Sequence, residues 1–159
     1  LALTGELAAL RRWHAEYFLE FAEAAVPLLR GGEQAAWLDR LEADFDNLRA
    51  ALEWSLSPEG DPELGLRLSG ALAWLWHCRS HLGEARRWLA LVLARSAEPS
   101  PGRVAALAGA GWLAHIQQDS ETARPLLEEA LALARARNDG GIFRRALSDL
   151  TARLLAPPE

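Results

Sequence analysis

The sequence predicts an all-α protein built as a stack of antiparallel helix hairpins, and two observations lead to this prediction. First, residues 74–77 (Trp-Leu-Trp-His) recur 38 residues later as residues 112–115 (Trp-Leu-Ala-His), and Ala85 and Leu89 recur at the same offset as Ala123 and Leu127. A repeat of about this length, helical in both halves, is typical of stacked helix-hairpin arrays. Second, Leu and Ala dominate while Val, Ile and Thr are scarce, so the composition favours no sheet.

The first two of about seven expected helices cover residues 5–29 and 33–56, and Gly31-Gly32 separates them. The acidic residues on either side of Phe45 suggest a break or kink in the second helix. Apolar residues at three- and four-residue steps predict the face that each helix buries. For the first helix these residues are Leu7, Leu10, Tyr17, Phe21, Ala24 and Leu28, and for the second Trp37, Leu41, Phe45, Leu48 and Leu52.

The remaining helices are expected at residues 62–78, 82–96, 103–118, 119–137 and 142–155. The loop before them, residues 57–62, holds two prolines and a glycine. Asp61 should cap the helix that Pro62 opens, since an N-cap aspartate followed by proline is a common helix start. Asp119 or Ser120 should cap the helix that ends near Arg137, and the Asn-Asp-Gly-Gly run at 138–141 should stop it.

We therefore divide the chain into an N-terminal helical hairpin (1–57) and about two and a half repeats (61–159), packed as one continuous domain. Small residues are expected where the two helices of each hairpin approach closely: Ala73 and Gly111 in the first helices, and Ala85 and Ala123 in the second. A glycine inside a helix costs about 1 kcal/mol relative to alanine, so Gly111 should have a packing reason. Larger residues should close the interfaces: Leu89, Val92, Leu127 and Ala130 between layers, and Trp13, Trp37, Trp54 and Trp88 as anchors.

The charge and the cysteine content of the chain bear on its binding partners and on its cellular location. The net charge of −5, with arginines and glutamates alternating along helix faces, argues against nucleic-acid binding, which needs basic patches. No apolar run reaches membrane-spanning length, and a signal peptide is not evident. Cys78 is the only cysteine, so no intrachain disulfide can form and a cytoplasmic location is expected. The first residues, Leu-Ala-Leu, and the Pro-Pro near the end suggest a module of a longer protein.

The second repeat resembles the tetratricopeptide repeat. Ala123, Leu127 and Ala130, with Gly111 twelve residues before Ala123, match its small and large positions. The unit departs from that family in length, 38 residues against about 34. It also lacks the proline that closes the second helix, since Arg135 stands near that place. The resemblance implies a tetratricopeptide-like α-solenoid.

Three other segments resemble bacterial STAND-type signal-transduction ATPases, which include LuxR-type and antibiotic-regulator-type transcription factors. They are residues 14–19 (HAEYFL), 37–42 (WLDRLE) and, as the best match, 46–54 (DNLRAALEW). The resemblance implies that a nucleotide-binding NB-ARC module and a winged helix lie upstream in a parent chain. The Gly-x-x-x-x-Gly-Lys-Ser/Thr phosphate loop is absent because the sequence has no lysine. We therefore expect no nucleotide cofactor in this segment.

The candidate binding surface comprises Trp74, His77, Trp112 and His115. In a tetratricopeptide-like array the first helix of each hairpin lines the concave face, and the residue after Ala73 or Gly111 turns about 100° toward it. Trp and His on such a face can stack on a partner and hydrogen-bond to it. The alternative interpretation is that both tryptophans fill the core between layers.

Other constellations are weaker. His77, Cys78 and His81 could suggest a metal site, but the spacing crosses an expected helix end and lacks a fourth ligand, so we expect no metal. No nucleophile, base and acid stand in a recognisable arrangement, so we expect no enzyme.

Two functions stay open. One is an interaction or sensor module that binds a protein, a peptide or a small inducer on its concave face and acts on an upstream ATPase. The other is an architectural or self-association arm with no ligand of its own. The expected last helix exposes an apolar edge that could pair with a second copy as a homodimer: Ile142, Phe143, Leu147, Leu150 and Leu154.

Overall fold

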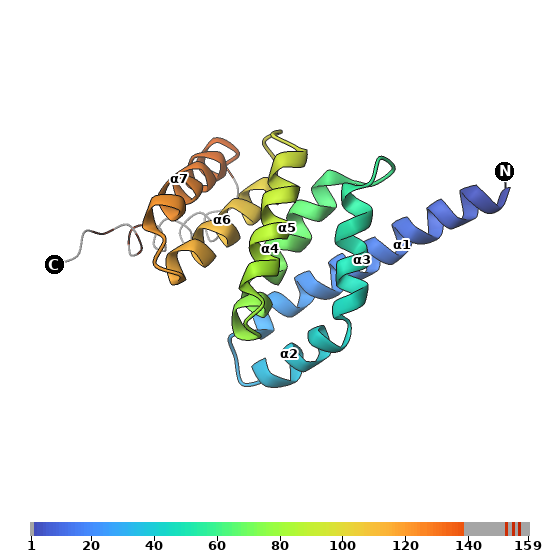
Figure 1. The fold of residues 1–159 in the computed structure, drawn as a ribbon, viewed down its shortest axis with the longest axis horizontal. Helices are drawn as coiled ribbons and strands as arrows, with labels where there is room; N and C mark the ends of the chain where they lie inside the picture. Colours follow the sequence, from blue (N-terminus) through green and yellow to red (C-terminus); the bar gives the residue numbers. More distant parts are fainter. Residues whose placement is uncertain (1, 139–151, 153, 155, 157–159) are drawn as a thin grey trace.

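The computed structural model describes residues 2–138 together with residues 152, 154 and 156, and every regular element in that part is helical. The helices pack as antiparallel pairs, as Figure 1 shows, which confirms the all-α prediction. The expected helix at 142–155 and its apolar edge fall outside the described residues. None of the helices in the described part is both long and apolar enough to cross a membrane. They are α1 (Ala2–Ala25), α2 (Gln34–Ala43), α3 (Phe45–Leu56), α4 (Pro62–Cys78), α5 (Leu82–Arg95), α6 (Pro101–Ile116) and α7 (Ser120–Ala136), with a 3-10 turn η1 (Val26–Leu28) after α1.

Side-chain caps set where three of the helices begin. The Asp61 carboxylate accepts a hydrogen bond from the Glu63 N–H at 3.0 Å, as predicted. Of the two candidates for the cap of α7, Asp119 and Ser120, the structure has Asp119, which accepts from the Thr122 N–H at 3.2 Å. Helix α6 begins at Pro101, two residues earlier than expected. The reason is that the Ser100 hydroxyl caps it and the proline takes the first helical position.

The predicted break near Phe45 is confirmed. Helices α2 and α3 meet at Asp44, whose φ of −98° and ψ of 17° leave the helical region. On either side of the break, Leu41, Leu48 and Leu52 are each 1% exposed, so the predicted buried face of this segment is also correct.

The predicted buried face of α1 is wrong for most of its residues, although Phe21 is partly buried against the core. Leu7, Leu10 and Tyr17 are about half exposed, at 47%, 59% and 52%. The buried residues of α1 are Ala15, Phe18, Leu19, Ala22 and Ala25. All of them lie in its second half, which packs on α3 and α4, whereas the first half projects beyond the body of the protein (Figure 1).

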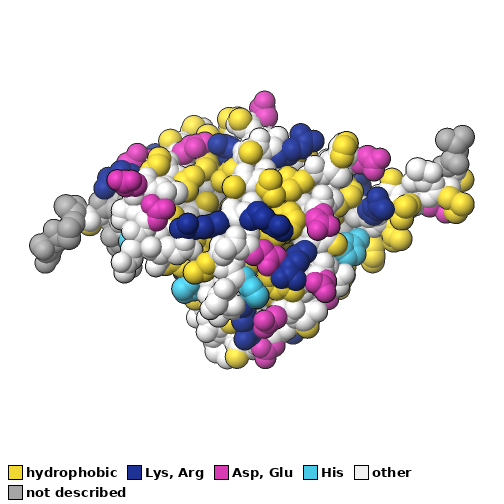
Figure 2. Space-filling view, in the orientation of Figure 1, with side chains coloured by type: hydrophobic (Ala, Val, Ile, Leu, Met, Phe, Trp, Pro, Cys, Tyr) yellow, Lys and Arg dark blue, Asp and Glu magenta, His cyan; other side chains and the backbone are white. Residues whose placement is uncertain are grey.

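Trp13 was expected to anchor an interface, and this prediction is also wrong. Its side chain is 61% exposed and stacks only on Tyr17, at 5.8 Å between ring centroids, among the ring contacts of the described residues. Because α1 carries apolar residues on more than one face, periodicity could not show which face meets the body. Figure 2 shows apolar side chains along this projecting end.

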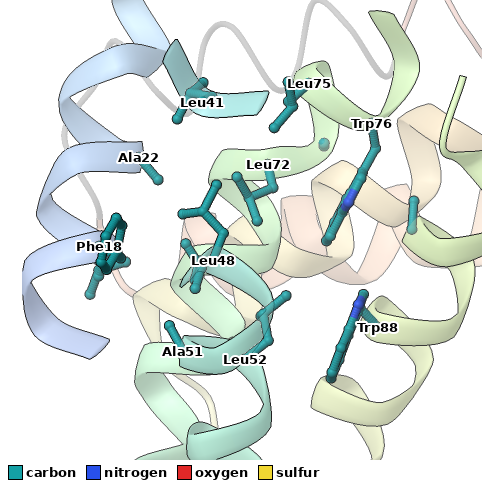
Figure 3. Close-up of a cluster of buried hydrophobic side chains, with 14 of the residues drawn as sticks. Phe18, Ala22, Leu41, Leu48, Ala51, Leu52, Leu72, Leu75, Trp76 and Trp88 are labelled. Carbon is teal, nitrogen blue, oxygen red and sulfur yellow. The ribbon is translucent and has the colours of Figure 1, made fainter. Parts of the chain in front are cut away.

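The core extends from α1 to α6 with α4 at its centre. Figure 3 shows Phe18, Leu48 and Leu72, from α1, α3 and α4, gathered in one cluster, with Trp76 and Trp88 beside them. Trp76 is fully buried and Trp88 is 4% exposed, so these two rings fill the space between α4 and α5. Of the other predicted anchors, Trp54 is buried and Trp37 is partly buried against the same core.

Gly111 has the packing role that the repeat predicts. A Cβ atom at this position would lie 2.6 Å from Cγ of Leu127 and 3.3 Å from its backbone nitrogen. Leu127 is fully buried, so it has little space into which to move. Ala85 and Ala123, the predicted small residues of the second helices, are also fully buried.

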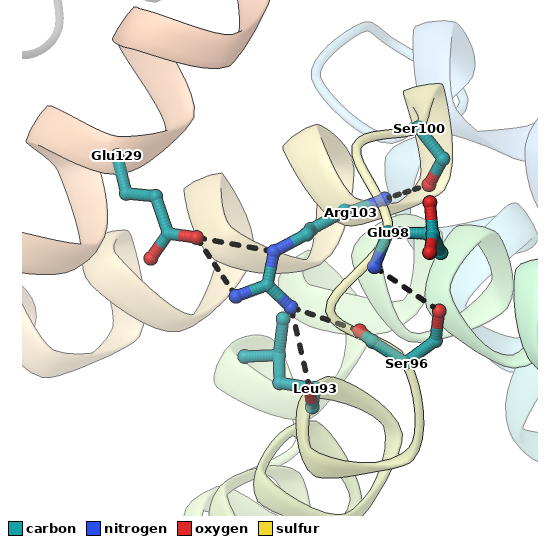
Figure 4. Close-up of polar contacts among 6 residues, drawn as sticks. All are labelled: Leu93, Ser96, Glu98, Ser100, Arg103 and Glu129. Atoms are coloured by element: carbon teal, nitrogen blue, oxygen red, sulfur yellow. Dashed lines mark hydrogen bonds and ion pairs between the residues drawn. The ribbon is translucent and has the colours of Figure 1, made fainter.

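One arginine joins three segments around α6. The Arg103 guanidinium donates hydrogen bonds to Glu129 of α7, the shorter at 2.7 Å, and to the carbonyl oxygens of Leu93 and Ser96, at 3.3 and 3.0 Å (Figure 4). Its backbone N–H donates to the Ser100 hydroxyl. Arg103 therefore ties the end of α5 and the connection after it to α7.

A second polar contact joins α3 to α5. The Arg49 guanidinium donates to both carboxylate oxygens of Glu84, at 2.6 and 2.9 Å, and the Trp88 indole N–H adds a third hydrogen bond at 3.2 Å. The hydrogen bonds from Arg49 are the main reason that the pKa of Glu84 lies below its ordinary value.

Replacing Gly111 by alanine should destabilise the protein, because the new methyl group overlaps Leu127. We expect a loss of about 1–3 kcal/mol, typical of overpacking. The matched control is Gly83→Ala in α5, where nothing lies within 4 Å of the added Cβ. That variant should be stabilised by about 0.4–1 kcal/mol. Urea denaturation measures both, and equal free energies of unfolding for the two variants would contradict the close contact.

The lowered pKa of Glu84 predicts a pH dependence of stability. Folding favours the carboxylate, so its contribution is fully present above the unfolded-state pKa of about 4.3 and is lost as the pH falls through the lower folded-state pKa. Denaturation of wild type and Glu84→Gln between pH 7 and pH 3 should therefore show a stability difference that shrinks below about pH 4.3. Glu53→Gln is the control, because it makes the same substitution at an exposed position of α3 outside this ion pair.

Candidate functional site

Three of the four predicted site residues lie together in one ring cluster. Trp74 and Trp112, which occupy equivalent positions in α4 and α6, stack with 5.2 Å between ring centroids and 22° between planes. The His77 ring meets Trp112 edge-on at 5.2 Å and lies 5.8 Å from Trp74. His115 is partly exposed near the end of α6, and none of the described ring contacts includes it.

The stack exists because α4 and α6 approach very closely. A Cβ atom on Gly70 would lie 2.7 Å from Cβ of Ala105 and 2.8 Å from its carbonyl carbon. One on Gly109 would lie 3.2 Å from Cβ of Ala73. Only small side chains fit at this crossing, and the sequence offered Ala73 alone among these four as a contact residue.

Beside the stack lies an open groove of about 400 Å³ between the end of α1, helix α4 and helix α6. Its lining combines the two tryptophans with Val26 and Leu29, a set of small residues and three charged side chains. The small residues are Gly70, Ala71, Ala73, Ala105, Ala108 and Gly109, and the charged residues are Glu23, Arg30 and Arg67.

Two of the three charged residues neutralise each other. Arg67 donates hydrogen bonds to both carboxylate oxygens of Glu23, one of them from Nε at 3.2 Å. These hydrogen bonds are the main reason that the pKa of Arg67 lies above its ordinary value. The pair spans α1 and α4 and fixes one side of the groove.

None of the three charged residues of the groove was predicted from the sequence, and Arg30 is the one that forms no ion pair among the described residues. Its guanidinium carbon lies 4.6 Å from the centroid of the Trp74 ring. The contact joins residues 44 positions apart, in the turn after η1 and in α4, so no local pattern indicates it.

Trp74 and Trp112 pack against the core and also line the groove. Both side chains are partly buried, and the Nε1–H of Trp74 has no acceptor among the described residues. Each of the two sequence interpretations, core filler and groove residue, is therefore correct for part of these two side chains. The partner-facing role of the four residues stays a prediction.

The weak metal candidate does not assemble. His77 packs on Trp112 of α6, whereas His81 packs on Phe45 of α3, at 4.9 Å between centroids. Burial raises the pKa of the Cys78 thiol, which disfavours the thiolate that a metal would need. Within the described residues no three His, Cys, Asp or Glu side chains lie close enough to hold a metal ion.

Comparison with known proteins finds relatives among bacterial regulators. The chain is 30% identical over 144 residues to proteins of Mycobacterium bovis and of two Mycobacterium tuberculosis strains. All three carry the name HTH-type transcriptional regulator as a provisional assignment. The match covers 85% of this chain but 16% of each relative, so the chain spans about a sixth of their length. No family model and no solved structure matches the chain.

The burial of the tryptophans predicts a larger loss of unfolding free energy at Trp76 than at Trp112. Trp76→Ala should cost about 3–5 kcal/mol, because that side chain is fully buried in the core. Trp112→Ala should cost about 1–2 kcal/mol, since part of its surface already faces the groove. Chemical denaturation of the two variants measures the difference, and an equal loss in both would assign Trp112 to the core alone.

Proposed function

We propose that this chain is a non-catalytic interaction or sensor module of a larger transcriptional regulator. It takes a protein, a peptide or a small inducer into the groove between α1, α4 and α6. The observation that carries this proposal is the stacked pair Trp74 and Trp112, which lies half-buried along a groove of about 400 Å³. Large aromatic side chains in such a position supply most of the binding energy at many recognition sites.

The comparison with regulators supports the context of the proposal. A segment of about a sixth of those proteins leaves room for further domains. The resemblance of residues 46–54 to STAND ATPases favours an upstream nucleotide-binding module in the parent chain as a partner of this segment. The net charge of −5 favours DNA contact through another part of the parent chain.

A second function, self-association or a purely architectural arm, is favoured by one observation. The projecting half of α1 exposes Leu3, Leu7, Leu10 and Trp13, of which Leu3 is 81% exposed. Exposed apolar residues in such a run are typical of contact surfaces. Sedimentation of wild type and Leu7→Gln over a range of concentrations tests self-association through this surface. If α1 mediates it, the wild type should show a larger average molecular mass than the variant at high concentration.

The main test uses the full regulator that carries this chain. Trp112→Ala should abolish or strongly reduce the transcriptional response to its inducer or partner, because the aromatic wall of the groove is lost. Nucleotide binding by the parent should be unchanged. Leu91→Ala is the control, since that side chain is exposed on α5, outside both the groove and the projecting half of α1. A reporter assay at equal protein levels measures the response, and a normal response in Trp112→Ala would refute the proposal.

A further inference from the structure

We infer that the groove binds a small, flat apolar molecule that carries one anionic group, and that Arg30 binds this group. The inference rests on the proposed function, because it names the ligand chemistry of the same groove. Its support comes from the charge balance of the lining, the setting of Arg30, and the size and shape of the space.

The charge balance favours an anion. The groove lining holds two arginines and one glutamate, which leaves one surplus positive charge in a protein whose net charge is −5. Glu23 is already bound by Arg67 through two hydrogen bonds, so its carboxylate does not attract a cation strongly. The surplus charge therefore belongs to Arg30.

Arg30 is held where an anion could meet it. Leu29, the preceding residue, is 1% exposed, and its N–H donates to the Val26 carbonyl at 3.3 Å, so the backbone beside Arg30 is anchored in the core. The guanidinium lies 4.6 Å from the Trp74 ring centroid. The guanidinium has no carboxylate partner among the described residues, so its N–H donors can bind the carboxylate of a ligand.

Size and shape favour a flat apolar body. A space of about 400 Å³ is typical of small-molecule sites. Much of the groove lining beside the rings consists of glycines and alanines, whose small side chains leave space for a planar group. The neighbouring Trp112 offers an aromatic surface for stacking.

Calorimetric titration of the chain with 2-naphthoate and its neutral analogue 2-naphthamide tests the inference. Wild type should bind the carboxylate at least about tenfold more tightly than the amide. Arg30→Gln should reduce that ratio to near one, and the exposure of Arg30 makes the change harmless to the fold. The matched control is Arg87→Gln, because Arg87 is also exposed and lies 5.2 Å from the Trp88 ring, outside the groove. It should keep the wild-type ratio.

Every other result overturns part or all of the inference. Equal affinity for both probes, lost in Trp112→Ala, would leave the groove as a binding site but refute its preference for anions. A preference that persists in Arg30→Gln would place the anion elsewhere. Acetate binding as tightly as 2-naphthoate would refute the flat apolar body. Failure of both probes to bind would refute this ligand class, whereas the response of the Trp112→Ala regulator judges the proposed function separately.

Discussion

The close crossing of α4 and α6 is the constraint on which the candidate site depends. Gly70 of α4 packs directly against Ala105 of α6, and Gly109 of α6 packs directly against Ala73 of α4, with no larger side chain between the helices. Each glycine costs a helix about 1 kcal/mol relative to alanine, and the packing of two long helices offsets that cost. Because the crossing joins equivalent helices of neighbouring repeats, it brings Trp74 and its counterpart into a stack and leaves the groove beside them.

Helix α4 places its two tryptophans in different surroundings. Trp74 and Trp76 are two residues apart, which is a turn of about 200° around the helix axis. One ring therefore lies along the groove and the other is fully buried against α5. A change at Trp74 can therefore alter the groove while Trp76 keeps its place in the core.

Arginines act as the long polar connectors between helices. Arg49 reaches Glu84 between α3 and α5, Arg67 joins α4 to α1, and Arg103 ties α5 and the connection after it to α7. A planar guanidinium suits this role because it binds a carboxylate through two parallel hydrogen bonds. Against this background Arg30 differs, since it contacts a tryptophan ring and no carboxylate among the described residues.

The sequence by itself determined what depends on neighbours within about four residues or on the repeat: the all-helical fold, the cap at Asp61, the break near Phe45 and the packing role of Gly111. Cap hydrogen bonds and hydrophobic periodicity depend only on residues close in the sequence, so a single sequence can show them. Only the tertiary structure decided the buried face of α1, because that helix is apolar on several sides and projects beyond the body. The same holds for Arg30, whose contact with α4 follows from how helices distant in sequence cross, and no local pattern encodes that geometry.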